Sequence, residues 1–458
     1  MINRLAIFGA TGDLTARYLL PALASLHAAG EIDGTFELTA IGREDWSEAE
    51  FGQWAAAELD RHAADLPPPV RTAVASAARY RQADVSDPAS VAGVIAGDGP
   101  VACYLALPPA VFPLAVAALR DAGLPEGSRI VLEKPFGEDL ASAIELNRQL
   151  AATVPERAVF RVDHFLAMTT VQNLLGTRLA NRVFEPIWNS THIAGIDIVW
   201  DESLALEGRA GYYDGVGALK DMLQNHLLQI LCLVAMEPPI SLGERDLRDR
   251  KVDVLRSVRP LTGQDLEQAT CRGQYTAGRI GTREIPAYAD EDGVDPAHRT
   301  ETFAEMELGL DNWRWPDTVF RLRTGKALAQ DRKQVTVRFR HVPHLPFAHG
   351  GDEAPNLLRF GLEPESVSLE LTGTGPNART LSPMTLQAQL QPADLPAYGQ
   401  LLHAVLSGDT ALGIRADEAE ESWRVVAPVI TAWSEDIVPL ENYPAGSAGP
   451  PRPPGPAR

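Results

Sequence analysis

The chain lacks the features that would suit a membrane, a secreted scaffold or a nucleic-acid partner. No apolar run is long enough to span a bilayer and no basic, signal-like segment opens the sequence, so we expect no membrane partner. The 3 cysteines among 458 residues form no CxxC pair, which is typical of a reducing cytoplasm. A formal net charge of −20 would repel phosphate backbones, so nucleic acid is not expected as a partner.

Lysine is scarce, whereas arginine is plentiful. Lysine stands only at Lys134, Lys220, Lys251, Lys326 and Lys333. Any anionic ligand must therefore be held by a local basic site. With 45% hydrophobic and 22% charged residues the composition is that of a globular protein, and the length suits two or three domains.

A glycine-containing turn follows the first apolar stretch of the chain. Residues 5–8 run into the sequence GATGDL, and a helix is predicted over residues 15–29. Glycines at such a turn let the backbone approach a pyrophosphate, and the helix N-terminus favours its charge. A glycine pair alone is a weak signal, but a second strand over residues 36–41 completes the expected context. The predicted cofactor contacts are Gly9, Thr11, Gly12, Asp13 and Leu14.

Arg43 follows the second predicted strand, where a dinucleotide-binding fold meets the adenosine ribose. An arginine there suits the 2′-phosphate of NADP, whereas an acid suits the free hydroxyl of NAD. Glu44 and Asp45 come next, which leaves NAD possible. The alternative for Arg43 is a solvated surface residue. We expect NADP as the cofactor.

Two further strands, over residues 101–107 and 129–132, are separated by helical stretches. This alternation predicts an α/β, Rossmann-like domain with a doubly wound parallel sheet. Lys134 follows the second of these strands and precedes a proline. That is a rigid place to hold a cation against a ligand, although a surface lysine paired with Glu133 is the alternative.

Asp163 and His164 lie in the stretch RVDHFLAMTTVQN, residues 161–173, at the end of another apolar run. In an open α/β sheet, ligands bind outside the carboxyl ends of the strands, so this pair marks a candidate site. The alternative is that both residues cap the helix that follows.

The pattern changes after residue 172, where we place the boundary of the first domain. Residues 193–200 and 335–340 alternate as half-buried strands, and residues 302–310 and 367–371 look similar. Few helices separate them, which predicts a larger β+α domain over residues 173–444 with a mainly antiparallel sheet. Residues 445–458, rich in proline and glycine, are predicted to be disordered.

A long helix is predicted over residues 217–234, apolar on most faces and therefore buried. It carries the polar residues Lys220, Asp221, Gln224, Asn225 and His226. Buried polar groups are costly unless paired or functional, so their clustering favours a ligand pocket over a satisfied core histidine. As α-helical positions, Asp221 and His226 lie about 140° apart. The histidines of HVPHLPFAH are broken up by prolines, and we expect no metal site.

Several blocks together resemble the glucose-6-phosphate dehydrogenase family across nearly the whole chain. They are GATGDL at 9–14, EKPFG at 133–137, RVDHF at 161–165, and longer matches at 207–239 and 299–326. The resemblance implies NADP-dependent oxidation of a sugar at C1 to a lactone. It also implies a cytoplasmic enzyme that forms a homodimer or homotetramer, with the large sheet at the dimer interface.

The resemblance also implies roles for individual residues. His226 matches the general base that takes the proton of the C1 hydroxyl, and Asp163 matches the carboxylate that orients this base. His164 matches a phosphate ligand. The residues matching sugar contacts are Lys134, Glu202, Asp221 and Lys326, and Lys134 is expected at the cofactor as well.

The departures from the family gather around the substrate phosphate. The family motif D-H-Y-L-G-K-E places a tyrosine and a lysine there, where this chain has Phe165 and Met168. Tyr18 stands for a usual lysine and Asp331 for a usual basic residue, although Arg332 is adjacent. Each charge-assisted bond lost is worth about 1.5–3 kcal/mol, so two or three losses predict roughly a thousandfold weaker binding of glucose 6-phosphate or more.

Three hypotheses follow. We favour an enzyme that oxidises a non-phosphorylated or modified hexopyranose. The first alternative is an ordinary glucose-6-phosphate 1-dehydrogenase of the pentose phosphate pathway with compensating arginines. The second is a catalytically silent cofactor-binding homologue, which the retained Asp163 and His226 disfavour.

Overall fold

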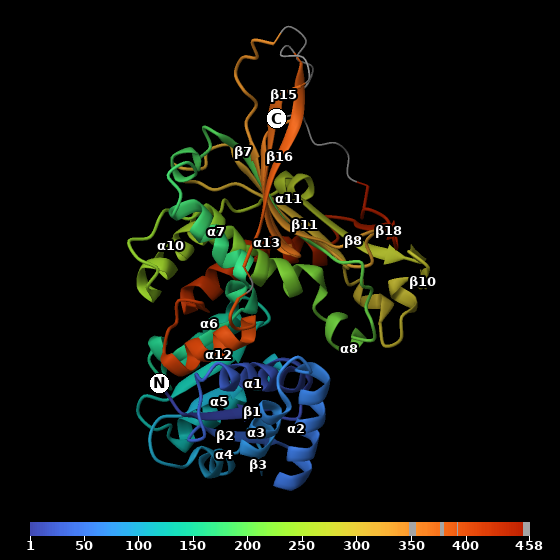
Figure 1. Ribbon diagram of the computed structural model, residues 1–458. Coiled ribbons are helices and arrows are strands. Elements are labelled where there is room, and N and C mark those ends of the chain that lie inside the picture. The colour runs from blue at the N-terminus through green and yellow to red at the C-terminus, as the bar shows by residue number, and fades with distance from the viewer. Residues whose placement is uncertain (348–353, 376–379, 392, 452–458) are drawn as a thin grey trace. The chain divides into compact units, whose positions relative to one another are not determined.

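The computed structural model describes residues 1–347, 354–375, 380–391 and 393–451. Contacts within the chain divide it into two compact units, each built around one large sheet (Figure 1). The first unit comprises residues 1–168, 239–249 and 392–420, and the second comprises residues 169–238, 250–391 and 421–458. Neither unit is continuous in sequence, unlike the domains expected from the pattern.

The late segment joins the first unit because helix α12 (Ala397–Ser407) packs on helix α1 (Leu20–Ala28). Leu401, Leu402 and Val405 share one apolar core with Leu23. Helix α12 therefore buries its apolar face against the nucleotide-binding unit, far from its neighbours in sequence.

The sheet of the first unit has the order β17-β6-β5-β4-β1-β2-β3, parallel except for β17. Its strands are β1 (Arg4–Phe8), β2 (Glu37–Gly42), β3 (Ala78–Gln82), β4 (Ala102–Leu105), β5 (Arg129–Glu133), β6 (Val159–Val162) and β17 (Gly413–Ile414). The further helices are α2 (Glu48–His62), α3 (Pro68–Ala77), α4 (Pro88–Ile95), α5 (Phe112–Ala122) and α6 (Leu140–Ala151). Strand β1 is buried along its whole length, as expected of a parallel strand covered on both faces. The expected doubly wound sheet is confirmed.

The sheet of the second unit has the order β16-β15-β14-β13-β7-β12-β11-β8-β18 and is mainly antiparallel, as expected. Its strands are β7 (Ile193–Asp201), β8 (Thr270–Thr276), β11 (Phe303–Leu308), β12 (Val319–Gly325), β13 (Arg332–Phe339), β14 (Leu357–Glu363), β15 (Glu365–Thr374), β16 (Leu381–Gln389) and β18 (Leu440–Pro444). A small hairpin joins β9 (Gly278–Ile280) to β10 (Arg283–Ile285). Figure 1 shows β15 and β16, in orange, as a long hairpin.

Strand alternation gives this second sheet one apolar and one charged face. Ile196 and Ile198 on β7 are fully buried, whereas Asp197 between them pairs with Arg321 and Arg338 at 2.9 and 3.0 Å. The helices of the unit are α7 (Thr169–Leu179), α8 (Ala210–Tyr213), α9 (Leu228–Ala235) and α11 (Gln264–Ala269). Residues of α10 (Glu244–Ser257) and α13 (Ala416–Ser434) are divided between the two units.

Both helices singled out from the sequence contain a π-helical segment, which the apolar pattern did not predict. The segment η1 (Thr15–Leu19) precedes α1, and η6 (Leu219–Leu227) precedes α9. Their backbone hydrogen bonds skip one more residue than in an α-helix, as in the bond from the Leu228 N–H to the Leu223 carbonyl. Such segments are rare and occur frequently at functional sites.

The described part of the predicted tail is ordered, so the expectation of disorder is wrong for residues 445–451. The Gly446 N–H donates to the Ala327 carbonyl at 2.8 Å, and Arg323 donates to the Ala448 carbonyl at 2.7 Å. Residues 452–458 and His349 lie outside the described residues. Within the described ranges, no helix is both long and apolar enough to cross a membrane.

Candidate functional site

The residues predicted for the cofactor lie at the carboxyl edge of the first sheet. Strand β1 stands between β2 and β4, so the strand order reverses beside it. In open α/β sheets, ligands bind in the crevice at this reversal. Gly9 follows β1, Lys134 follows β5 and Asp163 follows β6. Parallel strands therefore bring the three sequence-predicted positions to one edge of this unit.

The turn after β1 depends on the missing side chain of Gly9. Gly9 has φ +86°, and a Cβ there would stand 2.2 Å from the carbonyl oxygen of Ala106. The N–H groups of Gly9 and Ala10 both donate to the Ile41 carbonyl at 2.9 Å. This close approach of three strand ends leaves a backbone cradle before the helix N-terminus, and it fits a dinucleotide pyrophosphate.

Arg43 and Glu44 take different positions after β2. The Arg43 side chain is exposed, whereas Glu44 accepts a hydrogen bond from the Thr11 hydroxyl at 3.0 Å. A backbone hydrogen bond to its own amide lowers the pKa of the Glu44 carboxyl, which is therefore ionised at neutral pH. Glu44 is thus hydrogen-bonded to the glycine turn, whereas the Arg43 side chain beside it is exposed to solvent.

Asp163 is fully buried and accepts a hydrogen bond from the Phe165 N–H at 2.9 Å. It caps a short 3-10 helix, η4 (His164–Ala167), so the capping alternative is realised for this residue. Phe165 is only 4% exposed and meets the His164 ring edge-on, with centroids 5.0 Å apart. The Phe165 side chain thus packs around His164 and is not exposed to solvent. Met168 is partly buried.

Glu133, which precedes Lys134, has a buried carboxyl with a raised pKa. The Tyr104 hydroxyl donates to Glu133 at 2.5 Å. Burial raises the pKa of the Glu133 carboxyl to about 7, against the hydrogen bond from Tyr104 and the charge of Lys134, which lower it. Glu133 therefore titrates near neutral pH in the folded protein.

This titration predicts a pH-dependent stability. Between the ordinary glutamate pKa of 4.5 and about 7, the folded protein keeps a proton that the unfolded chain releases. Stability should therefore fall as pH rises through this window, by up to about 3 kcal/mol for this carboxyl. Urea unfolding of the wild type and Glu133→Gln at pH 5 and pH 8 measures the effect. From pH 5 to pH 8, Glu133→Gln should lose less stability than the wild type. Identical losses would contradict the titration of Glu133 near pH 7.

In the second unit, Glu202 and Lys326 follow neighbouring parallel strands, β7 and β12, whose residues Asp201 and Gly325 are paired. Lys326 Nζ donates to Glu202 Oε2 at 2.7 Å and lies over the Tyr213 ring, 5.2 Å from its centroid. The Trp200 indole N–H donates to the other carboxylate oxygen of Glu202 at 3.3 Å. The structure therefore brings these two predicted sugar contacts together as an ion pair.

The π-helical segment η6 carries both Asp221 and His226. In a helix with i→i+5 hydrogen bonds, residues five apart lie nearly one above the other. The expected separation of about 140° assumed α-helical geometry and is wrong for this segment. His226 is 2% exposed, and the Tyr212 hydroxyl donates to Asp221 at 3.2 Å. The wider turn therefore reduces the angle between this carboxylate and this imidazole about the helix axis relative to an α-helix.

Asp331 and its basic neighbours are engaged within the second unit. Asp331 accepts hydrogen bonds from the N–H and hydroxyl of Ser203 at 2.7 and 3.0 Å. Arg332 pairs with Asp201 at 2.8 Å, and Lys333 pairs with Glu363 at 2.6 Å. A compensating role for Arg332 or Lys333 at a substrate phosphate would require these ion pairs to break.

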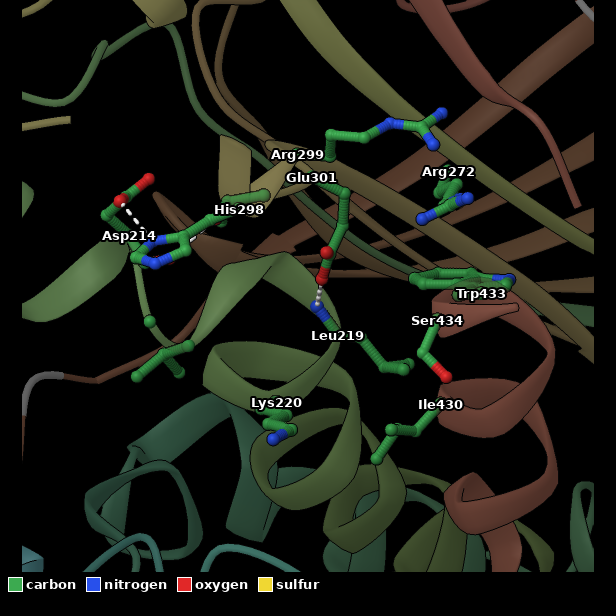
Figure 2. A pocket seen from close by; sticks show the side chains of 13 residues that line it. Asp214, Leu219, Lys220, Arg272, His298, Arg299, Glu301, Ile430, Trp433 and Ser434 are labelled. Atoms are coloured by element: carbon green, nitrogen blue, oxygen red, sulfur yellow. Dashed lines mark hydrogen bonds and ion pairs between the residues drawn. The ribbon is translucent and has the colours of Figure 1, made fainter. Parts of the chain in front are cut away.

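A cavity of about 410 Å³ lies beside the start of η6 (Figure 2). Glu301 accepts a hydrogen bond from the Leu219 N–H at 3.0 Å, and Asp214 pairs with His298 at 2.7 Å, both drawn in Figure 2. Arg272 and Arg299 both pair with Asp436. Of these charged groups, Glu301 holds the start of the helix that carries His226, through the Leu219 N–H.

Sequence reasoning missed three aromatic residues that the structure places beside predicted site residues: Tyr212, Tyr213 and Tyr398. Tyr212 and Tyr213 stand in a block that was quoted only for its resemblance, and Tyr398 was not singled out at all. Tyr398 lies on α12, and its ring stacks on His164 with centroids 5.5 Å apart. A local pattern carries no signal for a contact between such distant segments.

Comparisons with known proteins agree with this arrangement. A family model described as glucose-6-phosphate dehydrogenase, NAD binding domain, matches residues 6–173, and the C-terminal domain model of the same family matches residues 175–453. The glucose-6-phosphate 1-dehydrogenase of Mycolicibacterium smegmatis is 40% identical, covering 97% of this chain and 93% of the relative. That of Zymomonas mobilis is 36% identical, covering 98% and 96%.

Solved structures show the same similarity. Glucose-6-phosphate 1-dehydrogenase from Mycobacterium avium superposes with a TM-score of 0.87 at 33% identity, covering 98% of this chain and 95% of that one. A glucose-6-phosphate dehydrogenase in complex with its substrate glucose 6-phosphate gives 0.88 at 29% identity, with the same coverage. The chain belongs to the glucose-6-phosphate dehydrogenase family, whose members are oxidoreductases that act on a sugar CH–OH group with a nicotinamide dinucleotide.

Proposed function

We propose that this protein is a glucose-6-phosphate 1-dehydrogenase that uses NADP. The supporting observation is full-length similarity, including to a solved family member that holds glucose 6-phosphate. This reverses the preference drawn from the sequence departures, which favoured a sugar without the phosphate. The similarity extends over 97% of the chain, whereas the departures concern a few side chains at one end of the sugar.

The proposed chemistry starts at His226, which takes the proton of the C1 hydroxyl as general base. The imidazole is 2% exposed, so the proposed base is kept away from bulk water. Asp163 is the proposed carboxylate that stabilises the protonated imidazole. When bound, the nicotinamide accepts the hydride that leaves C1, and the sugar becomes a lactone. Lys134, Glu202, Asp221 and Lys326 are the proposed contacts to the sugar.

A screen of sugars and sugar phosphates with the purified enzyme tests the proposal, with reduction of NADP followed by absorbance. Glucose 6-phosphate should give the highest kcat/KM. A higher value for glucose or another neutral hexose would overturn the assigned substrate but leave the reaction type standing.

A hexopyranose without a 6-phosphate is the second candidate, favoured by the changed residues at the phosphate end. Tyr18 and Met168 replace cations, and Arg332 is held by Asp201. Arg17 lies over the Tyr18 ring, 5.8 Å from its centroid, and is the arginine nearest in sequence to the lost lysine. The same screen separates the two candidates. The expected homodimer or homotetramer stays a prediction, which light scattering would test.

The proposed preference for NADP predicts the effect of Arg43→Ala. The exposed guanidinium is available to a 2′-phosphate, and losing such a charge-assisted contact should raise the Kd for NADP by about 10–100-fold. The Kd for NAD should stay nearly unchanged. The control is Arg79→Ala, which removes another exposed arginine on the adjacent strand β3. Calorimetric titration measures both constants, and equal losses for both cofactors would refute the assignment.

A further inference from the structure

Three aromatic rings of the first unit form a continuous stack that ends on His164. Tyr18 and Tyr398 stack with centroids 5.0 Å apart and an interplanar angle of 29°. Tyr398 also stacks on His164, with centroids 5.5 Å apart and an interplanar angle of 20°. Tyr398 is 9% exposed, whereas Tyr18 is 42% exposed. The imidazole therefore has a ring against its face, and Phe165 meets it edge-on.

The hydroxyl of the middle ring, Tyr398, is under the influence of a buried carboxyl. Burial, and after it the charge of the Glu133 carboxyl, raises the pKa of the Tyr398 hydroxyl, and Glu133 accepts a hydrogen bond from Tyr104 at 2.5 Å. Glu133 ends β5 and Tyr104 lies on β4, in the middle of the parallel sheet. The carboxyl that acts on Tyr398 thus comes from a strand in the middle of the sheet, whereas Tyr398 itself comes from α12.

We propose that Tyr398, anchored by Glu133, is a positioning residue that holds the imidazole of His164 in place for the substituent at C6 of the sugar. The inference rests on the proposed function in one respect, which is that His164 contacts this substituent. A stacked and edge-packed imidazole has few rotamers left, so it loses little entropy on binding. The stack would thus recover part of the binding affinity that is lost because position 18 carries a tyrosine in place of the usual lysine.

The anchor should respond to pH. The groups that act on Glu133 are Tyr104 and Tyr398, which donate to it, and the charged Lys134 and Asp163. Above a pH of about 7 the carboxylate accepts from both tyrosines. Below it, the protonated carboxyl is uncharged, so the hydrogen bonds that it can accept from the tyrosine hydroxyls are weaker. The KM for glucose 6-phosphate should therefore rise as pH falls below 7, beyond any effect of the substrate's own titration.

Three variants test the inference through KM and kcat. Tyr398→Leu removes the ring and should raise the KM for glucose 6-phosphate by about three- to tenfold, the worth of one aromatic pair, with kcat nearly unchanged. Tyr398→Phe keeps the ring and loses the anchor, so it should give a smaller rise. Glu133→Gln should remove the extra pH dependence of KM. A KM unchanged in Tyr398→Leu would overturn the inference.

A second measurement needs no substrate. In protein with labelled histidine rings, the His164 signal, identified by its loss in His164→Asn, should carry a ring-current shift from Tyr398. Tyr398→Leu should abolish this shift, and Tyr398→Phe should preserve most of it. The matched control is Tyr80→Phe, which loses a buried tyrosine hydroxyl bond to the Glu44 carbonyl in the same unit.

The outcomes separate the two proposals. If the wild type does not oxidise glucose 6-phosphate but the His164 signal shifts as expected, the proposed function fails and the positioning of His164 stands. If the enzyme is active and the signal is the same in wild type and Tyr398→Leu, the positioning fails. Should Tyr398→Leu not fold, Tyr398→Phe still tests the anchor, because a KM profile identical to wild type would overturn it.

Discussion

Replacing His226 by asparagine should lower kcat for the native sugar by about 10²–10⁴-fold, the usual cost of removing a general base. Asparagine is similar in size and keeps a polar group on η6, where the imidazole is 2% exposed, so folding should survive. Cofactor affinity should be unchanged, because the glycine turn lies in the other unit. Steady-state kinetics and a cofactor titration measure the two effects.

The control for this substitution is His192→Asn, which changes an exposed histidine of the same unit. It should leave kcat near the wild-type value. Asp163→Asn should lower kcat less than His226→Asn, since the base remains and loses only its proposed orienting charge. Near wild-type turnover by His226→Asn would mean that another group takes the proton.

The second large effect is expected from Gly9→Ala, which should abolish measurable cofactor binding. The new Cβ would stand 2.2 Å from the Ala106 carbonyl oxygen, so the backbone after β1 or β4 must move. A displaced turn would no longer let a pyrophosphate approach the backbone before the helix N-terminus. The residue would also hold φ +86°, which costs a non-glycine residue about 1–3 kcal/mol. Thermal unfolding should show the loss of stability, and a titration the loss of binding.

Gly30→Ala is the matched control for Gly9→Ala. Gly30 also has a positive φ, +75°, but nothing lies within 4 Å of the added Cβ. It should lower stability through backbone strain and leave the cofactor Kd unchanged. If both variants bound the cofactor like the wild type, the turn after β1 would not be the pyrophosphate site.

Local sequence determined the elements whose pattern is repeated over several residues. Strand β1 is buried on both faces and therefore has an unbroken apolar run in the sequence. Strand β7 has an alternating pattern of apolar and polar residues. Both patterns predicted a strand at the right place. The turn at Gly9 was recognisable because its residues are contiguous and each has a local backbone role. Asp163, Lys134 and His226 were likewise found from strand ends and from a polar cluster in an apolar helix.

Tertiary structure decided the details that depend on distant partners. The sequence around His226 predicts an α-helix, and only the folded chain shows that Leu219–Leu227 is π-helical. The tail residues 445–451 have the composition of a disordered segment, yet they hydrogen-bond to the strand ends of the second unit. Backbone geometry of this kind follows from packing and leaves no periodic trace in the sequence.

The contacts around the His164 side chain are the feature that the sequence predicted least well. Its own stretch predicted a histidine at a strand end, and comparison with the family drew attention to the residues missing beside it. The ring stacked on it comes from Tyr398 on α12, and the proposed anchor of this ring, Glu133, comes from β5. Non-local contacts of this kind depend on how helices and strands pack once formed, so the sequence determined which residues are present and the fold decided which of them meet.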